Sequence, residues 1–279
     1  MTEKPLSYPD VHWDGSVRKR PFKHDLKTST WGIKMSSTRK PFADRHERQS
    51  RVISSDLLSK YPVAVVGVGA IGRQVAVQLA VIGVSPIVLI DGDLVTPIHL
   101  GSHGFREEDV GKPKVDATAE WIRQLNGDIE VHANYRRFHR TDDVGMVLFC
   151  CVDNSETRGH IFRSVSEKSK FFIDARTDGE SVRILTICNK RAALYYPNSL
   201  FRSRDMIRAS RESQATFYAA GAAAGIMVAH YARWLRGQKP QMEIVLDLQR
   251  DELMANVPFH KPRITLRRLI AARESVLQQ

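Results

Sequence analysis

Cysteine is scarce in this sequence. Its 279 residues include only three cysteines, Cys150, Cys151 and Cys188. Three thiols are too few for a disulfide framework or for a zinc site held by four thiolates. The scarcity favours a cytoplasmic protein whose thiols stay reduced.

Long apolar runs are also missing. Arg, Gln or Asp interrupts every hydrophobic stretch, whereas a membrane-spanning helix needs about 20 consecutive apolar residues. The N-terminus lacks the apolar core of a signal peptide. We therefore expect no association with a membrane. Hydrophobic residues still make up 42% of the chain, which suffices for the core of one large α/β domain.

Acidic residues are outnumbered by basic ones. The chain has 31 Asp and Glu against 42 Lys and Arg, a formal net charge of +11. This excess favours acidic partners such as nucleotides, nucleic acid or an acidic protein, although a solvated basic surface would explain much of it. We expect residues 1–44 to form a basic, irregular arm ahead of one domain at 45–279. Because acids interrupt its bases, we expect the arm to pack on protein rather than on nucleic acid.

Residues 63–93 predict a strand, a loop, a helix and a second strand in succession. The segments 63–66 and 87–90 are apolar and β-branched, as in strands buried on both faces. Between them lie glycines at G-x-G-x-x-G spacing: Gly67, Gly69 and Gly72. Such glycines permit a tight turn, close approach to a phosphate and close helix packing, and the following helix N-terminus can hold an anion. This setting favours a nucleotide site over a turn used only for packing.

Three further polar residues fall where a nucleotide site needs them. Asp91 ends the second strand about twenty residues after Gly72, the distance at which an acid reaches a ribose hydroxyl. Lys114 precedes a predicted helix at 115–125 and can reach phosphate, unless it is simply exposed at a turn. Asp153 follows a buried strand at 146–152, where it can hold Mg²⁺ or cap the next helix.

The remaining segments complete an α/β fold. The sequence predicts a doubly wound, Rossmann-like, mainly parallel sheet with antiparallel strands in the C-terminal half. We expect a loop at 94–109; its His99 and His103 could bind a metal, but no third ligand is evident. The other predicted elements are helices at 42–58, 156–166, 217–235 and 261–279, strands at 129–132, 171–174 and 243–248, an antiparallel pair at 182–188 and 193–196, and an Arg-rich loop at 197–216.

Five short motifs, in order, resemble those of the ThiF/MoeB adenylyltransferases, the group that includes ubiquitin-activating enzymes. The resemblance runs from about Arg45 to about Leu248. The lysine and the strand-end Asp-Asn favour ATP over NAD. The matching stretches are Arg45–Gln49 (R-Y-x-R-Q), Gly67–Gly72 (the glycine loop), Asp91–Asp93 (D-x-D), Gly111–Lys114 (G-x-P-K) and Asp153–Arg158 (D-N-x-x-x-R).

The resemblance implies a role for each motif. Asp91 and Asp93 would bind the ribose side, and Arg48 and Lys114 would neutralise the triphosphate. Arg48 would be offered by the other subunit of a homodimer. Asp153 would hold Mg²⁺. The nucleotide-binding set would also include Asn154 and Arg158. The implied reaction is attack of a carboxylate on the α-phosphate of ATP, which gives an acyl adenylate and pyrophosphate. The family's usual carboxylate is the C-terminal glycine of a ubiquitin-like protein.

The sequence departs from the family in three places. Residues 99–103 align with the family's N-L-x-R-Q, so Ser102 replaces a phosphate-contacting arginine; Arg106 is a nearby substitute. The two C-x-x-C pairs that hold structural zinc in many members are absent, and the crossover loop at 196–217 has no cysteine. We therefore expect the chain to stop at the acyl adenylate and to pass it to a separate conjugating or acceptor protein.

Four functions compete. The leading one is adenylation of a protein or peptide C-terminus in a bacterial ubiquitin-like or sulfur-carrier-type system. The second is a relative directed at tRNA or a small molecule, which the net charge would also suit. The third is a non-catalytic nucleotide-binding scaffold, which Ser102 favours. An NAD-dependent oxidoreductase ranks last.

Overall fold

A computed structural model describes residues 45–200 and 216–255. These residues form one eight-stranded sheet in the order β3-β2-β1-β4-β5-β6-β7-β8. Neighbours from β3 to β5 run parallel, and those from β5 to β8 antiparallel. The predicted fold class is confirmed. The strands are β1 (Val63–Val66), β2 (Ile87–Asp91), β3 (Val131–Tyr135), β4 (Val147–Cys150), β5 (Phe171–Asp178), β6 (Ser181–Ile187), β7 (Glu243–Asp247) and β8 (Glu252–Ala255).

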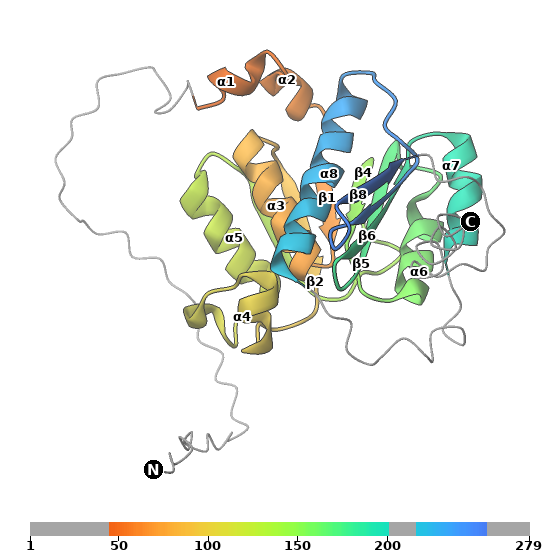
Figure 1. Cartoon of the computed structure of the whole chain (residues 1–279). Coiled ribbons are helices and arrows are strands. Elements are labelled where there is room, and N and C mark those ends of the chain that lie inside the picture. Colours follow the sequence, from red (N-terminus) through yellow and green to blue (C-terminus); the bar gives the residue numbers. More distant parts are fainter. Residues whose placement is uncertain (1–44, 201–215, 256–279) are drawn as a thin grey trace, which may run out of the picture. The chain divides into compact units, whose positions relative to one another are not determined.

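Helices cover both faces of the sheet (Figure 1). One face packs against α3 (Ala70–Ile82), α5 (Lys114–Leu125) and α8 (Phe217–Leu235). The other packs against α6 (Ser155–Val165), α7 (Lys190–Tyr195) and the 3-10 turn η2 (Tyr196–Ser199). Alternation along the strands divides the side chains between the two layers: in β1, Val63 and Val65 face α3, while Ala64 and Val66 face α6.

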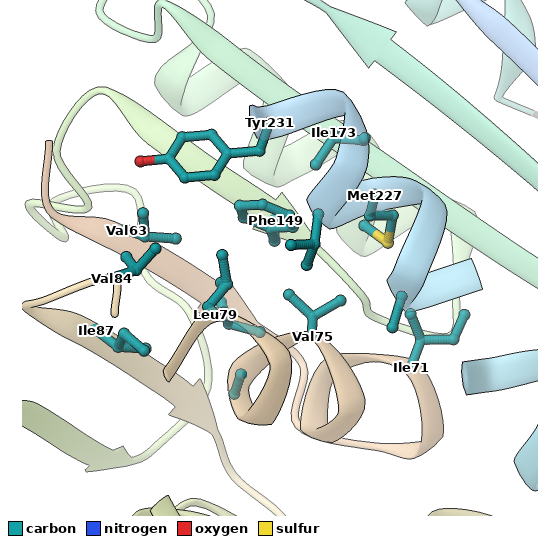
Figure 2. Packing of buried hydrophobic residues seen from close by; sticks show 14 of the residues in the cluster. Val63, Ile71, Val75, Leu79, Val84, Ile87, Phe149, Ile173, Met227 and Tyr231 are labelled. Carbon is teal, nitrogen blue, oxygen red and sulfur yellow. The ribbon is translucent and has the colours of Figure 1, made fainter. Parts of the chain in front are cut away.

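The larger core lies between the sheet and the α3–α8 pair (Figure 2). The ring of Phe149 on β4 meets that of Tyr231 on α8 edge to face, with centroids 5.8 Å apart. Val75 and Leu79 of α3 are fully buried beside them, as is Met227 of α8. Each such side chain stabilises the fold by about 1.5–3 kcal/mol relative to an exposed position. The glycine loop at the start of α3 therefore rests on a rigid support.

Strand order reverses at β1. The chain builds outward from β1 to β2 and β3, then returns to place β4 on the other side of β1. At such a switch point the loops after the two central strands diverge and leave a crevice at their carboxyl ends, where ligands bind in open α/β sheets. The loop after β1 and the residues after β4 meet there.

The first described helices differ from the prediction. Residues 42–58 do not form one helix. Their described part contains two single-turn helices, α1 (Glu47–Ser50) and α2 (Ser55–Leu58). The break follows from Ser54, whose hydroxyl accepts the Leu57 N–H at 3.4 Å and caps α2, and from Ile53, which is buried between the two turns.

Two other local predictions were wrong. The region 94–109 contains a helix, α4 (Ile98–His103), and a 3-10 turn, η1 (Glu107–Asp109). Residues 193–196 are helical, not extended, because Asn189 caps α7 by accepting the Ala192 N–H at 3.0 Å. Strand β6 pairs with β5 and β7 instead, and β8 was not predicted.

Several predictions lie outside the described residues. These are the arm at 1–44, most of the Arg-rich loop at 197–216 and the final helix at 261–279. Among the helices that the structure describes, none combines the length and apolar character needed to cross a bilayer.

Candidate active site

The three glycines of the loop differ in what they permit. Gly67 has φ +87°, and a Cβ there would lie 2.7 Å from the carbonyl carbon and oxygen of Cys151, the residue that follows β4. A Cβ at Gly72 would lie 1.8 Å from Gly67 O. These two glycines let strand, loop and helix pack closely. Gly69 is the N-cap of α3, and a Cβ there would meet only His103 Cε1, at the ordinary contact distance of 3.7 Å. The open face of the loop is therefore at Gly69.

The first turn of α3 offers backbone donors to this open face. Helical hydrogen bonding starts with Arg73 N–H, which donates to Gly69 O at 3.0 Å. The earlier N–H groups of the turn are not used within the helix, as at any helix N-terminus. Together with the helix dipole they favour a negative group such as phosphate.

Asp91 ties the glycine loop to the end of β2. Its Oδ2 accepts the Val68 N–H at 2.6 Å, and its Oδ1 accepts the Asp93 N–H at 2.8 Å. The carboxylate thus fixes the turns that follow β1 and β2. Each carboxylate oxygen has a second lone pair, so the predicted contact with a ribose hydroxyl is compatible with this clamp.

Asp93 and Lys114 form an ion pair at the mouth of the site. Lys114 Nζ lies 3.1 Å from Asp93 Oδ2; the lysine side chain is only 6% exposed, the aspartate 59%. Backbone bonds hold the pair in register, since Lys114 N–H donates to Asp93 O at 3.0 Å. The structure therefore brings these two predicted residues together, with the ammonium buried and the carboxylate exposed.

Asn154, and not Asp153, takes the capping role that the sequence left open for Asp153. Asn154 Oδ1 accepts the Thr157 N–H at 2.7 Å, so Asn154 is the cap of α6. The exposed Asp153 carboxylate contacts the Asn154 amide at 3.4 Å. Asp153 is thus not needed to cap the helix. It lies just beyond Cys151 and Val152, whose backbone packs against Gly67.

Arg158 is buried beneath Asp153 rather than facing the loop. Its guanidinium pairs with the buried Asp174 and donates to two backbone carbonyls, Ala175 O at 3.0 Å and Val152 O. The second bond holds the peptide immediately before Asp153. Burial lowers the pKa of Arg158. These contacts support the segment that carries Asp153.

Asp174 is the centre of a charge cluster that sequence reasoning missed. The carboxylate is fully buried. Besides Arg158, it accepts hydrogen bonds from Arg176 Nε at 2.9 Å and from the Tyr196 hydroxyl at 3.2 Å. The sequence signal is the acid that directly follows the apolar run at 171–173. Arg176 also reaches Ser199 O at 2.8 Å, so the cluster joins the end of β4 to η2.

Helix α4 occupies the place of the family's N-L-x-R-Q motif. The Ser102 hydroxyl donates to Ile98 O at 3.0 Å, within its own helix. Arg106 forms a two-pronged contact with Asp109 at 3.2 and 3.1 Å and an ion pair with Glu108 at 2.5 Å. The Arg106 guanidinium also lies 5.4 Å from the ring centre of Trp121. Both side chains are therefore already engaged within the protein.

Arg48 is distant from the glycine loop of its own chain. It is exposed on α1, and its neighbour Gln49 donates to Ile82 O at the C-terminal end of α3. Arg45 donates to Leu125 O at the end of α5. The glycine loop is at the opposite end of α3, a helix of 13 residues and therefore roughly 20 Å long. The structure does not bring Arg48 together with Lys114 and Asp153.

The cysteines are covered in the way that strand alternation predicts. Cys150 belongs to the core layer facing α6, whereas Cys151 packs against the layer facing α3. Cys150 is buried, and Cys151 and Cys188 are half-buried. Burial raises the pKa of all three thiols.

The donor set fits a magnesium ion that is shared with phosphate. Among the described residues, no three His, Cys, Asp or Glu side chains gather to form a metal cage. Mg²⁺ commonly uses one or two carboxylates together with substrate phosphates and water. The exposed Asp153 at the strand end suits that arrangement.

Solved structures share the fold at low sequence identity. E. coli MccB with ATP matches with a TM-score of 0.61 and 18% identity, over 76% of this chain and 70% of that one. The same protein, described as a microcin C7 biosynthetic enzyme, in complex with N-formylated MccA matches with a TM-score of 0.61 and 17% identity, over 80% and 74%. At such identities the likeness shows the fold alone.

Sequence relatives match over part of their length. Ubiquitin-like modifier-activating enzyme 5 of Bombyx mori is 26% identical over 152 residues, 49% of this chain and 39% of that protein. Adenylyltransferase and sulfurtransferase uba4 of Aspergillus terreus is 34% identical over 131 residues, 42% and 26%. The chain therefore spans less than half the length of these relatives. The family model described as ThiF matches residues 46–265, most of the chain. This protein belongs to the ThiF family.

Proposed function

We propose that this chain is an ATP-dependent adenylyltransferase that activates the C-terminal carboxylate of a ubiquitin-like protein or a peptide. One observation carries the proposal. The open glycine turn at Gly69, the Asp93–Lys114 ion pair and the exposed Asp153 all follow the carboxyl ends of strands β1, β2 and β4 at the switch point. A plain dinucleotide-binding fold requires only the glycine turn.

The geometry supports a proposed role for each group. The triphosphate lies over the N-terminal turn of α3, whose N–H groups hold phosphate oxygens. The adenosine ribose meets Asp91 and Asp93 at the end of β2. Phosphate oxygens attract the Lys114 ammonium, which the protein already holds beside Asp93 at 3.1 Å. Buried positive charge of this kind stabilises the added negative charge of the transition state without reorganisation.

The reaction is a substitution at phosphorus. A carboxylate oxygen of the substrate bonds to the α-phosphorus of ATP, and the bond to the bridging oxygen of the β-phosphate breaks. Pyrophosphate leaves with that electron pair. The chain's main contribution is to position the two reactants and to balance their charge. Magnesium, when bound with the phosphates, supplies further charge neutralisation, and Asp153 would hold it.

We further propose that the active form is a homodimer. Arg48 is exposed at the end of α3 that lies away from its own glycine loop. A guanidinium there can serve a triphosphate only if it belongs to another subunit. The site is then complete only when two copies associate.

The substrate class rests on two supports. The net charge of +11 suits an acidic protein partner. Relatives bear the names of ubiquitin-like activating enzymes, and MccB has been solved with ATP and with MccA. Because the covered thiols are poor nucleophiles, a separate thiol or amine acceptor completes the pathway, in a cytoplasmic setting.

Pyrophosphate–ATP exchange tests the proposal. Wild-type protein with Mg²⁺, labelled pyrophosphate and a panel of ubiquitin-like proteins and short peptides should exchange label into ATP with one class of substrate. A matched substrate whose C-terminal carboxylate is amidated should give none. Exchange that is equally fast with the amidated substrate would show that the carboxylate is not the nucleophile.

The non-catalytic scaffold is the second candidate, and one observation favours it. Ser102 stands where the family has a phosphate-contacting arginine, and its hydroxyl is bonded to Ile98 O. A scaffold would bind ATP but catalyse no exchange with any substrate of the panel. Tight binding of tRNA, competed by ATP, would instead point to the tRNA-directed relative.

A further inference from the structure

The loss of the family arginine at Ser102 leaves the phosphate side of the site one cation short. The structure excludes the obvious substitutes. Ser102 bonds back to its own helix, with Oγ 3.0 Å from Ile98 O. Arg106 is held by Asp109 through two hydrogen bonds and by Glu108. Moving Arg106 to a phosphate would break these contacts and leave the buried Asp109 with fewer partners.

His99 is also committed. Its Nδ1 accepts the Thr96 N–H at 2.9 Å and lies 3.1 Å from the Thr96 hydroxyl. These contacts satisfy backbone at the start of α4. The imidazole of His99 stacks on that of His103, with ring centres 4.6 Å apart and planes at 21°. His99 therefore orients its neighbour rather than reaching into the site.

His103 differs from the other three. Its Nδ1 is buried and has no hydrogen-bond partner among the described residues. Its Cε1, the carbon between the two ring nitrogens, lies 3.7 Å from where a Cβ at Gly69 would be. The ring thus lies next to Gly69, the one glycine of the loop at which no backbone atom blocks a Cβ. A buried nitrogen without a partner costs free energy, and a phosphate oxygen seated on the glycine turn would supply that partner.

The surroundings of His103 are positively charged. Lys114 and Arg73 both lie close enough, with His99, to contribute to the lowering of its pKa to about 4, of which burial is the main cause. Arg73, on the first turn of α3, is only 5% exposed. Its guanidinium lies 4.9 Å from the ring centre of Phe105, and its Nε likewise has no partner among the described residues. Two cations gathered at a helix N-terminus favour an anion.

We propose that His103 is a phosphate-contacting residue, which donates a ring N–H to a phosphate oxygen of bound ATP in the place of the missing family arginine. The inference rests on the proposed function, because it assumes a triphosphate on the glycine turn. The neutral imidazole replaces the hydrogen-bond donor of that arginine but not its positive charge. His99 holds the ring in place by stacking, and Lys114 and Arg73 balance the remaining charge.

The test measures binding of ATP and of adenosine separately, by calorimetry with Mg²⁺. His103→Ala should weaken ATP binding about tenfold or more, the effect of one hydrogen bond to a charged group, and leave adenosine binding unchanged. His103→Asn, which keeps an N–H donor, should recover part of the ATP affinity. The matched control is Ser102→Ala, which should bind both ligands like wild type because that hydroxyl is used within α4.

The possible outcomes distinguish failure of the His103 proposal from failure of the proposed function on which it rests. Wild type that binds ATP, together with a His103→Ala protein that binds it equally well, overturns only the role of His103. An equal loss of ATP and adenosine binding in both His103 variants also overturns it, since that pattern marks a structural residue. Wild type that binds no ATP overturns the nucleotide site and this inference with it.

Discussion

The side-chain amide of Gln49 donates to the backbone carbonyl of Ile82 at 2.5 Å. The carbonyl belongs to the last turn of α3, and the glycine loop lies at the first turn of the same helix. Because Arg48 is next to Gln49 in the chain, this one bond fixes Arg48 about a helix length from its own glycine loop. The geometry leads directly to an experiment on which subunit supplies the arginine.

Mixed dimers should restore activity from two inactive proteins. Arg48→Ala and Asp153→Ala should each abolish pyrophosphate exchange. If Arg48 acts on the partner's site, a hybrid dimer contains one site that carries both changes and one intact site. A fully exchanged equal mixture should then recover about a quarter of wild-type activity. Lack of recovery, with hybrids verified by differently tagged subunits, would show that Arg48 acts within its own subunit or has no role.

Asp153 and Asn154 should separate catalysis from stability. Asp153→Ala should abolish exchange and leave the thermal midpoint unchanged, because Asp153 does not cap α6. Asn154→Ala removes the cap that accepts the Thr157 N–H at 2.7 Å, so it should destabilise the fold by about 1 kcal/mol. Thermal unfolding followed by circular dichroism and exchange assays on both variants provide the comparison. Normal exchange in Asp153→Ala would remove the metal-holding role from that residue.

The loop glycines make a second matched pair. Gly67→Ala should destabilise the protein by more than about 1 kcal/mol, because Gly67 has φ +87° and a Cβ there would lie 2.7 Å from the Cys151 backbone. Gly69→Ala has room for its methyl group, at 3.7 Å from His103 Cε1. It should fold normally but weaken ATP binding by crowding the phosphate. Equal unfolding midpoints for the two variants in urea would contradict the prediction.

The sequence predicted the central part of the fold well because local signals and tertiary structure agree there. The run before Gly67 is apolar on both faces, so β1 was expected to the residue. A helix was expected between the glycine loop and the strand at 87–90, and α3 lies there. The sequence placed Asp91 by its spacing from Gly72 and Lys114 by its position at the start of a helix. In each case a short-range pattern determines the structure, without help from distant contacts.

The wrong predictions concern segments whose structure is determined by tertiary contacts or by helix caps. Residues 98–103 include a glycine and show no clear helical pattern, yet Pro97 precedes them and Gly104, at φ +73°, ends the helix. Residues 193–196, which were predicted as a strand, are helical because Asn189 caps α7. The buried Asp174 cluster could not be predicted in full, because Arg158 and Tyr196 are distant from Asp174 in the sequence and meet it only when α6, β5 and η2 pack together.

Acid should destabilise the protein partly through His230. This imidazole is buried against Thr186, with Nδ1 2.7 Å from the hydroxyl, and burial with the nearby Arg233 lowers its pKa to about 4. In the unfolded chain the histidine takes up a proton near its ordinary pKa of 6.5. The unfolded state thus binds more protons as the pH falls from about 6.5 to 4, and stability falls with it.

A substitution isolates this contribution. His230→Gln retains a polar side chain but cannot titrate. Between pH 7 and pH 5 the variant should lose roughly 2 kcal/mol less unfolding free energy than wild type. Urea unfolding at the two pH values measures the difference. Identical losses in the two proteins would exclude His230 as an acid-sensitive group.

The covered cysteines predict where the chemistry of this chain ends. Formation of a thioester needs a thiolate that can reach the adenylate carbonyl. Cys151 is the nearest thiol to Asp153, yet it packs against the core layer beneath α3, and burial raises its pKa. Cys150 lies on the opposite layer, and Cys188 directly follows β6. The crossover loop contains no cysteine in its sequence.

We therefore expect no covalent complex between this chain and its substrate. Enzyme incubated with ATP, Mg²⁺ and the substrate identified by exchange should show no new band on a non-reducing gel, while an acyl adenylate accumulates and can be detected by mass spectrometry. Replacing Cys150, Cys151 or Cys188 singly with alanine should leave exchange intact, provided that the fold survives the small cavity. A band that reductant removes, and that disappears in one of the three variants, would show instead that the core opens during the reaction to expose that thiol.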